Sequence, residues 1–307
     1  MSSWEGKTRG GTLGYRIFIF LLEKINIRFS YALLRAVAAY FWIFSNKKPL
    51  LYFYQNRLQF SKMATYKAIY KNYVMLGECL LDKIVVMAGI KNKFTFDFDG
   101  ETHLHQLARE KKGGILIGAH IGNWEIAGHL LKRIDTKVHI VMLDAEHQKI
   151  KELLQDVLKE KHMSIIPIKD NYDHLYAIEE ALNKGEFIAI HGDRFLPGTK
   201  TVNNYFLNEE AQFPTGPFYM ASKFKAPVCY VSAIKTSRYH YKFRATKPEI
   251  LPFPGKLKTR NQDLKIMIEP YVRNLELIVR EDPSQWFNFY PFWSEENSEV
   301  TQTLKSK

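Results

Sequence analysis

The 307-residue sequence contains only two cysteines, Cys79 and Cys229, which lie far apart and form no C-x-x-C motif. A disulfide framework is therefore not expected, and a reduced, intracellular setting is the default for such a chain. The longest uncharged apolar run, residues 36–44, is much shorter than the roughly 20 residues that span a bilayer. No Ala-x-Ala-like site follows the first apolar stretch, so we expect no cleavable signal peptide.

Several motifs of catalysis and binding are also missing. The sequence has no Gly-x-Ser-x-Gly elbow, no Walker A loop and no Gly-x-Gly-x-x-Gly. His103 and His105 would share one face of a strand, but no third metal ligand is evident near them. No zinc-finger or RNP-type signature is present, which disfavours nucleic acid as a partner. We therefore expect a site that uses no cofactor and no metal.

The composition is that of a folded protein with an anionic partner. Hydrophobic residues make up 46% and charged residues 25% of the chain, which suffices for a packed core. The net charge is +12, an excess that suggests a membrane surface, a nucleic acid or an acidic protein or substrate. Because the basic residues are dispersed among aromatic residues, a membrane surface is the favoured interpretation.

The N-terminal segment 13–44 is rich in large apolar and aromatic residues, but charged residues interrupt it, among them Arg16 and Arg35. This pattern predicts two amphipathic helices that lie in the membrane interface. Two alternatives stay open: the helices cap a soluble core, or the segment spans the membrane. We place the membrane-associating helices in residues 1–48 and an α/β domain in residues 49–307.

From residue 94 onwards, apolar strands alternate with helices. Strands are predicted at 94–98, 115–119, 138–143, 164–168, 187–191 and 227–233, and helices at 104–111, 123–133, 148–161, 172–184 and 216–223. Such alternation with short connections indicates an α/β fold with a mainly parallel central sheet flanked by helices. Residues 50–89, which precede this unit, are also predicted to be helical.

The most informative segment follows the strand at 115–119. It carries His120 in a tight turn and Glu125 in the first turn of the next helix. Residues five apart on one continuous helix point about 140° away from each other, so the chain must bend for these two to meet. Gly122 and the helix-capping residue Asn123 supply the bend, and Trp124 supplies an apolar wall. A histidine held by a carboxylate is typical of a general base, although a structural turn histidine remains the alternative.

A second polar turn, Gly192-Asp193-Arg194, ends the strand at 187–191. Ligands of such sheets bind beyond the carboxyl ends of the strands, where His120 also lies. Arg194 could hold a phosphate or stabilise an oxyanion, with Asp193 fixing the arginine. A local Asp193–Arg194 ion pair that only closes the turn is the alternative. We expect His191, inside the strand, to belong to the core.

The residues 120–125, His-Ile-Gly-Asn-Trp-Glu, together with the turn at 192–194 and Phe-Pro-Thr-Gly-Pro at 213–217, resemble the lysophospholipid acyltransferase superfamily. Within it the chain most resembles the lipid A biosynthesis lauroyl/myristoyl acyltransferases, which share its aromatic segment 285–293. The resemblance implies a glycerolipid-acyltransferase-like fold. It also implies that His120 takes a proton from an acceptor hydroxyl and that Glu125 orients the imidazole. One departure is Arg194, where the lipid A enzymes often carry Gln.

The resemblance further implies an O-acyltransferase of late lipid A acylation at the cytoplasmic face of the bacterial inner membrane. The acyl thioester donor would be acyl carrier protein or acyl-CoA, and the acceptor a hydroxyl of a (glyco)lipid. The predicted catalytic residues are His120 and Glu125, and the predicted substrate-binding residues are Asn123, Trp124, Gly192, Asp193, Arg194 and Gly216. Candidate positions for docking an acidic donor protein are Lys223, Lys225, Lys235, Arg238, Lys242 and Arg244. The alternatives are an acyltransferase of the same fold acting on an aminolipid or pigment precursor, and a non-catalytic lipid-binding membrane protein.

Overall fold

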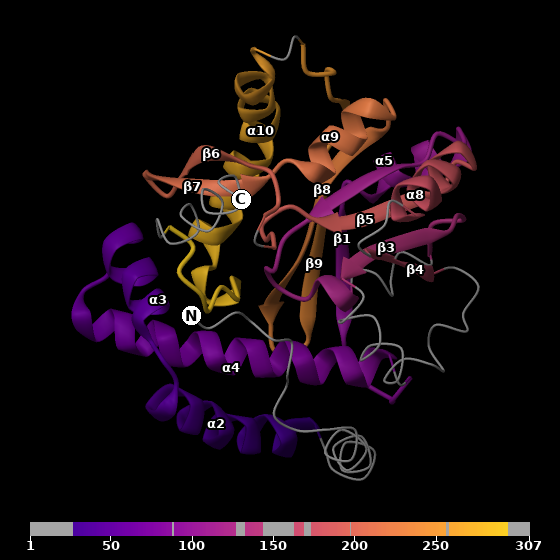
Figure 1. The fold of residues 1–307 in the computed structure, drawn as a ribbon. Coiled ribbons are helices and arrows are strands. Elements are labelled where there is room, and N and C mark those ends of the chain that lie inside the picture. Colours follow the sequence, from indigo (N-terminus) through magenta and orange to yellow (C-terminus); the bar gives the residue numbers. More distant parts are fainter. Residues whose placement is uncertain are drawn as a thin grey trace.

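The computed structural model describes residues 27–87, 89–126, 133–143, 163–168, 173–196, 198–255 and 258–293. The predicted helix at 148–161, most of the one at 123–133 and the N-terminal segment before residue 27 lie outside these residues. The rest forms a central sheet with helices on both sides and two further helices at one end of its strands (Figure 1).

Seven strands follow one another across the sheet in the order β1-β9-β8-β2-β5-β3-β4, and β10 pairs with β8. The five consecutive strands β8, β2, β5, β3 and β4 are parallel to one another, and β1 is parallel to β9. Strands β9 and β10 run antiparallel to β8. This confirms the predicted α/β fold with a mainly parallel sheet. The bounds are β1 (Thr95–Asp99), β2 (Gly114–Gly118), β3 (Val138–Leu143), β4 (Met163–Ile168), β5 (Phe187–His191), β8 (Pro227–Ser237), β9 (His240–Ala245) and β10 (Glu249–Ile250).

Helices cover both faces of the sheet, so its central strand β2 is buried along its whole length. Ile115 and Ile117 of β2 face the larger core. Leu116, which points to the other face, packs in a smaller core with Leu104 and Leu107 of α5. A strand covered on both sides needs apolar residues at every position, which explains the uninterrupted apolar run of β2. The covering helices are α5 (Glu101–Arg109), α8 (Asp173–Asn183), α9 (Gly216–Lys223) and α10 (Arg260–Glu281).

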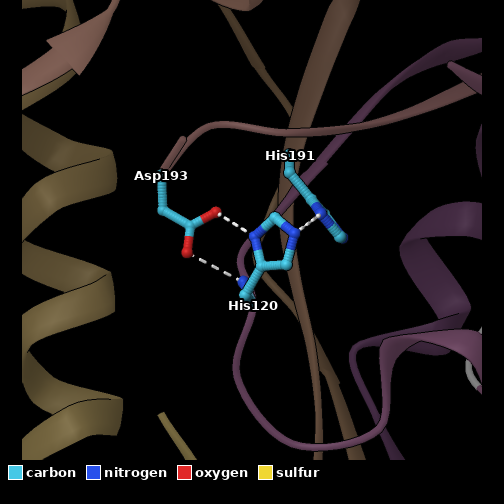
Figure 2. A group of neighbouring side chains, drawn as sticks. All are labelled: His120, His191 and Asp193. Atoms are coloured by element: carbon cyan, nitrogen blue, oxygen red, sulfur yellow. Dashed lines mark hydrogen bonds and ion pairs between the residues drawn. The ribbon is translucent and has the colours of Figure 1, made fainter. Parts of the chain in front are cut away.

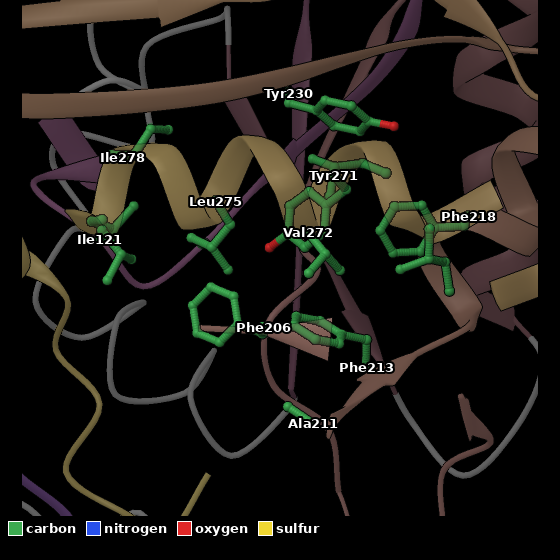
Figure 3. Close-up of a cluster of buried hydrophobic side chains, with 14 of the residues drawn as sticks. Ile121, Phe206, Ala211, Phe213, Phe218, Tyr230, Tyr271, Val272, Leu275 and Ile278 are labelled. Atoms are coloured by element: carbon green, nitrogen blue, oxygen red, sulfur yellow. The ribbon is translucent and has the colours of Figure 1, made fainter. Parts of the chain in front are cut away.

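The larger core is built around α10, a helix that was not predicted from the sequence. Its inward residues include Tyr271, Val272 and Leu275, which contact aromatic rings of a hairpin (Figure 3). The hairpin consists of β6 (Thr201–Phe206) and β7 (Glu209–Pro214), which pair antiparallel. Phe206 and Phe213 are fully buried in it. This cluster fixes the hairpin against α10.

The predicted helical region at 50–89 is divided into three parts: α3 (Lys48–Leu51), a π-helical segment (Tyr52–Arg57) and the long α4 (Lys62–Met87). Helix α2 (Ile27–Phe44) packs along α4 (Figure 1). Gly77 allows this close approach, because a Cβ atom there would lie 2.4 Å from Leu34 Cδ1. Among the described helices, α2 is the one that is long and apolar enough to cross a membrane, with a mean hydropathy of 1.3.

A buried polar cluster joins α2 and α4 to strand β8. Lys235 Nζ donates to Glu78 at 2.8 Å and to Asp82 at 2.7 Å, and the Tyr31 hydroxyl also bonds to Asp82. Burial raises the pKa of Asp82 above its usual value. Lys235 is only 4% exposed, so the prediction that it docks an acidic partner is wrong: its charge is compensated inside the protein.

Candidate active site

The turns that follow β2 and β5 lie side by side, because these strands are neighbours in the sheet. His120 Nδ1 lies 2.8 Å from Asp193 Oδ1, and the His120 backbone N–H donates to Asp193 Oδ2 at 2.9 Å. Figure 2 shows the carboxylate facing the edge of the imidazole ring. The predicted convergence of the two strand ends is therefore confirmed.

The ionisation of Asp193 determines which nitrogen of His120 can act as a base. Burial alone would raise the pKa of Asp193, but the charge and hydrogen bond of His120 and the nearby Arg194 outweigh it. Together they hold the pKa well below its usual range, so Asp193 is a carboxylate and can only accept hydrogen bonds. His120 Nδ1 must then carry the hydrogen, which leaves the lone pair on Nε2.

Glu125 does not hold the imidazole, contrary to the sequence prediction. Its carboxylate pairs instead with Lys83 Nζ of α4 at 2.8 Å. The predicted bend is present, since Gly122 has φ +64°, but the helical turn that follows directs Glu125 towards α4. The sequence motif therefore identified the turn correctly and the partner of His120 incorrectly.

Main-chain and side-chain contacts brace the turn after His120 from three sides. Gly122 N–H donates to Gln285 O at 2.9 Å, and Asn123 N–H donates to Ala233 O at 2.7 Å. Asn123 Nδ2 donates to Cys79 O at 2.8 Å, while its Oδ1 accepts from the Ile126 N–H at 3.4 Å. The predicted capping function of Asn123 is thus visible, and these bonds use much of its hydrogen-bonding capacity.

The predicted glycines of the site differ in their surroundings. A Cβ at Gly192 would lie 2.9 Å from Ile117 Cγ2 and from Tyr271 Cζ, so the turn after β5 requires glycine for packing. Gly216 begins α9, and nothing lies within 4 Å of a Cβ built there. It is also outside the set of residues that line the cavity beside His120.

A cavity of about 220 Å³ opens beside His120. One wall comes from α4, a second from the turn that carries Trp124 and Glu125, and a third from the C-terminal segment. The lining residues are Leu76, Cys79, Leu80, His120, Gly122, Asn123, Trp124, Glu125, Arg194, Phe287 and Phe289. Such a lining offers apolar surface next to one basic and one acidic side chain, as small-molecule sites do.

Arg194 lines this cavity without a carboxylate partner among the described residues. Its Nη2 donates to Phe287 O at 2.6 Å, and its Nε is buried without a hydrogen-bond partner. Both oxygens of Asp193 are bonded to His120. The predicted pairing in which Asp193 fixes Arg194 is therefore absent, and the guanidinium charge is available to a ligand.

His191 was expected to be a core residue, but it touches His120. Its Nδ1 lies 3.3 Å from His120 Nε2, and its ring meets Trp124 edge to face with a centroid distance of 4.5 Å. Burial, followed by the charge of His120, lowers the pKa of His191 well below its usual value. His191 lies two residues before Asp193 in the sequence, which could have indicated a position near the site. The apolar residues of the strand around it predicted a core position instead.

Within the described part of the chain, only His120, His191 and Asp193 offer three ligand atoms close enough to hold a metal ion, within 4.8 Å of one another. However, each ring nitrogen of His120 and each oxygen of Asp193 already has a protein partner. This geometry fits a hydrogen-bonded base better than a set of metal ligands.

The cavity wall formed by α4 was not predicted from the sequence. Leu76, Cys79 and Leu80 follow a three- and four-residue spacing, which places them on one helix face and could have indicated a shared surface. Burial raises the pKa of the Cys79 thiol far above its usual value, so this cysteine is unsuited to act as a nucleophile.

No curated protein matches the chain. The model of the family described as bacterial lipid A biosynthesis acyltransferase matches residues 61–295, a range that contains His120, Asp193 and every residue lining the cavity. This range is well over half of the sequence, and the chain therefore belongs to the bacterial lipid A biosynthesis acyltransferase family.

Proposed function

We propose that this protein transfers a fatty acyl group from an acyl thioester to a hydroxyl of a lipid A-type glycolipid, with His120 as the general base. The observation that carries the proposal is the 2.8 Å contact between His120 Nδ1 and the buried Asp193 carboxylate beside a cavity. A histidine fixed in this tautomer presents the lone pair of Nε2, which is what abstraction of a proton from a hydroxyl requires.

The reaction then proceeds without a covalent enzyme intermediate. His120 Nε2 takes the proton of the acceptor hydroxyl while the hydroxyl oxygen attacks the thioester carbonyl carbon. The tetrahedral intermediate collapses, the carbon–sulfur bond breaks, and the leaving thiolate takes the proton from His120. Asp193 orients the ring throughout and stabilises the imidazolium that forms transiently.

Arg194 is the group best suited to stabilise negative charge in this reaction. Its side chain lines the cavity, and its buried Nε has no hydrogen-bond partner in the described part of the chain. Donors in a partly desolvated site that are already aimed at a developing oxyanion contribute strongly to catalysis. A phosphate of the acceptor lipid is the second anion that the same fork would suit.

Glu125 has a different function in this proposal from the one implied by the motif. Because its carboxylate pairs with Lys83 at 2.8 Å, we assign it to the cavity wall that receives the acceptor. Trp124 and Phe289 supply apolar surface in the same cavity, and we assign them to contacts with the acyl chain or the acceptor.

We place the enzyme at the cytoplasmic face of the bacterial inner membrane, attached through α2. One side of this helix exposes an apolar stripe, here termed the outer stripe, made of Phe29, Leu33, Val37, Tyr40 and Phe44. Phe44 is 71% exposed, although large apolar side chains in such a row are normally covered. Acyl carrier protein and acyl-CoA both remain candidate donors, and both are acidic partners that suit a chain of net charge +12.

The test is an assay of the purified full-length protein with a lipid A precursor and a donor whose acyl group is radiolabelled, either the acyl thioester of acyl carrier protein or acyl-CoA. We expect a singly acylated product whose fatty acid is released by mild alkaline hydrolysis, as an ester requires. His120→Ala should lower the rate by at least about a thousandfold, because the base is lost, while binding to vesicles persists. An alkali-resistant product would identify an amine acceptor, and near-normal turnover in the variant would refute His120 as the base.

A further inference from the structure

The neighbour of His120 on the side opposite Asp193 is a second histidine that the proposed reaction does not use. His191 ends β5, and its Nδ1 lies 3.3 Å from His120 Nε2 (Figure 2). This is the nitrogen that must receive the proton of the acceptor hydroxyl. In the unliganded protein, His191 therefore occupies the position at the base that a substrate hydroxyl needs.

The direction of this hydrogen bond follows from the tautomer of His120. Because the Asp193 carboxylate can only accept, His120 Nδ1 is the donor on that side, and Nε2 has a lone pair. A contact between Nε2 and His191 Nδ1 is then a hydrogen bond only if Nδ1 of His191 carries the hydrogen. His191 is neutral, since burial and the charge of His120 lower its pKa well below the usual value.

The surroundings hold the His191 ring in this place. Trp124 packs edge to face against it, with ring planes at 90°. The backbone of Gly118 also borders the ring, since a Cβ built there would lie in van der Waals contact with His191 Cδ2, at 3.4 Å. A side chain already held by such packing loses little further rotamer entropy when it makes its hydrogen bond.

We propose that His191 is a positioning residue that caps the catalytic nitrogen of His120 in the resting enzyme and is displaced by the acceptor hydroxyl. The inference rests on the proposed function of His120. A neutral donor aimed at a lone pair stabilises the uncharged imidazole and opposes premature protonation. At 3.3 Å the hydrogen bond is long and therefore weak, so an incoming hydroxyl can replace it at small cost.

Other charged groups near His120 act together with this cap. Asp193 and Arg194 lie beside the ring, and Glu125, which pairs with Lys83, lines the same cavity. From α10 and the C-terminal segment, Tyr271 donates to Gly118 O and Tyr290 to Asp193 O. Burial raises the pKa of both tyrosines, so both are neutral. The substitutions below leave all these groups unchanged, so any shift they cause comes from position 191.

The experiment compares wild type with His191→Phe and His191→Asn in the full-length enzyme. Phe keeps a ring against Trp124 but cannot donate, whereas Asn carries an amide N–H near the position of Nδ1. For His191→Phe we expect the KM for the acceptor to fall about two- to tenfold, the size of one net hydrogen bond, with a smaller change in kcat. The acidic limb of the kcat/KM profile should move to higher pH. His191→Asn should behave like wild type in both respects.

A spectroscopic readout separates this inference from the proposed reaction. The ¹⁵N shift of His120 Nε2 in the unliganded protein should move towards that of a free lone pair in His191→Phe and stay near wild type in His191→Asn. An unchanged acceptor KM and an unmoved acidic limb in His191→Phe would overturn the cap. So would identical behaviour of the two variants, which would indicate a packing function. Full activity of His120→Ala would instead refute the proposed function, whatever the ¹⁵N shifts show.

Discussion

At the scale of single residues, the turn after His120 can form only where a glycine permits a positive φ and a close approach of two backbone segments. Gly122 has φ +64°, and a Cβ there would lie 2.0 Å from Ala233 O, which is a rigid backbone atom. Gly216 has no atom within 4 Å of the corresponding position. Alanine substitution should therefore have a large effect at Gly122 and a small one at Gly216.

Gly122→Ala should lower the free energy of unfolding by about 1–3 kcal/mol, because alanine is strained at this φ and collides with Ala233. A displacement of the His120 turn of about 1 Å should also cost about a hundredfold in kcat. Chemical denaturation and a transfer assay measure both effects.

Gly216→Ala is the matched control and should change the free energy of unfolding by less than about 1 kcal/mol, with activity retained. Loss of activity in this control would support the sequence prediction that Gly216 binds substrate. A stable and active Gly122→Ala protein would show that the turn tolerates a side chain.

At the scale of secondary structure, α2 combines two kinds of surface. Its inner side packs on α4, where Gly77 leaves room for Leu34, and Trp42 Nε1 donates to Tyr66 O at 3.1 Å. Its outer stripe faces away from the protein, and Leu33 in it is 54% exposed. A helix that is docked on one side and apolar on the other fits attachment to a membrane interface better than free solution.

Leu33→Asp should weaken binding to anionic vesicles by at least about tenfold. The variant loses the burial of a leucine side chain in the membrane interface, and the aspartate carboxylate must stay in water. Leu277→Asp on α10 makes the same change at a comparably exposed position, 65% for Leu277, and should leave vesicle binding unchanged. Vesicle flotation measures both. Equal binding of all three proteins would show that α2 is not the attachment site.

At the scale of the whole molecule, the period of the apolar residues predicted the core of the fold. The strands at 138–143 and 187–191 and the helix at 216–223 occupy the predicted residues, because continuous apolar runs and flanking glycines are local signals. The hairpin β6–β7, strand β9 and helix α10 were not predicted. Their stability comes from contacts such as those of Phe206 and Tyr271, which join distant parts of the chain.

The site could be predicted in part for the same physical reason. A strand followed by a polar turn is visible in the sequence, so His120 and Asp193 were both found. Which carboxylate reaches the ring depends on strand order, and that is a property of the folded sheet: β2 and β5 are adjacent, although 68 residues separate Gly118, which ends β2, from Phe187, which begins β5. The pairing of Glu125 with Lys83 likewise depends on where α4 lies in the folded protein.

The most direct test of the central claim, that Asp193 rather than Glu125 orients the base, compares Asp193→Asn with Glu125→Gln. Both variants keep the shape of the side chain and remove its charge. We expect kcat of acyl transfer to fall about a thousand- to ten-thousandfold in Asp193→Asn, as when the orienting carboxylate of a histidine base is lost. Glu125→Gln should lose less than about tenfold and keep its pH profile. The opposite order, with Glu125→Gln nearly inactive and Asp193→Asn nearly normal, would contradict the account.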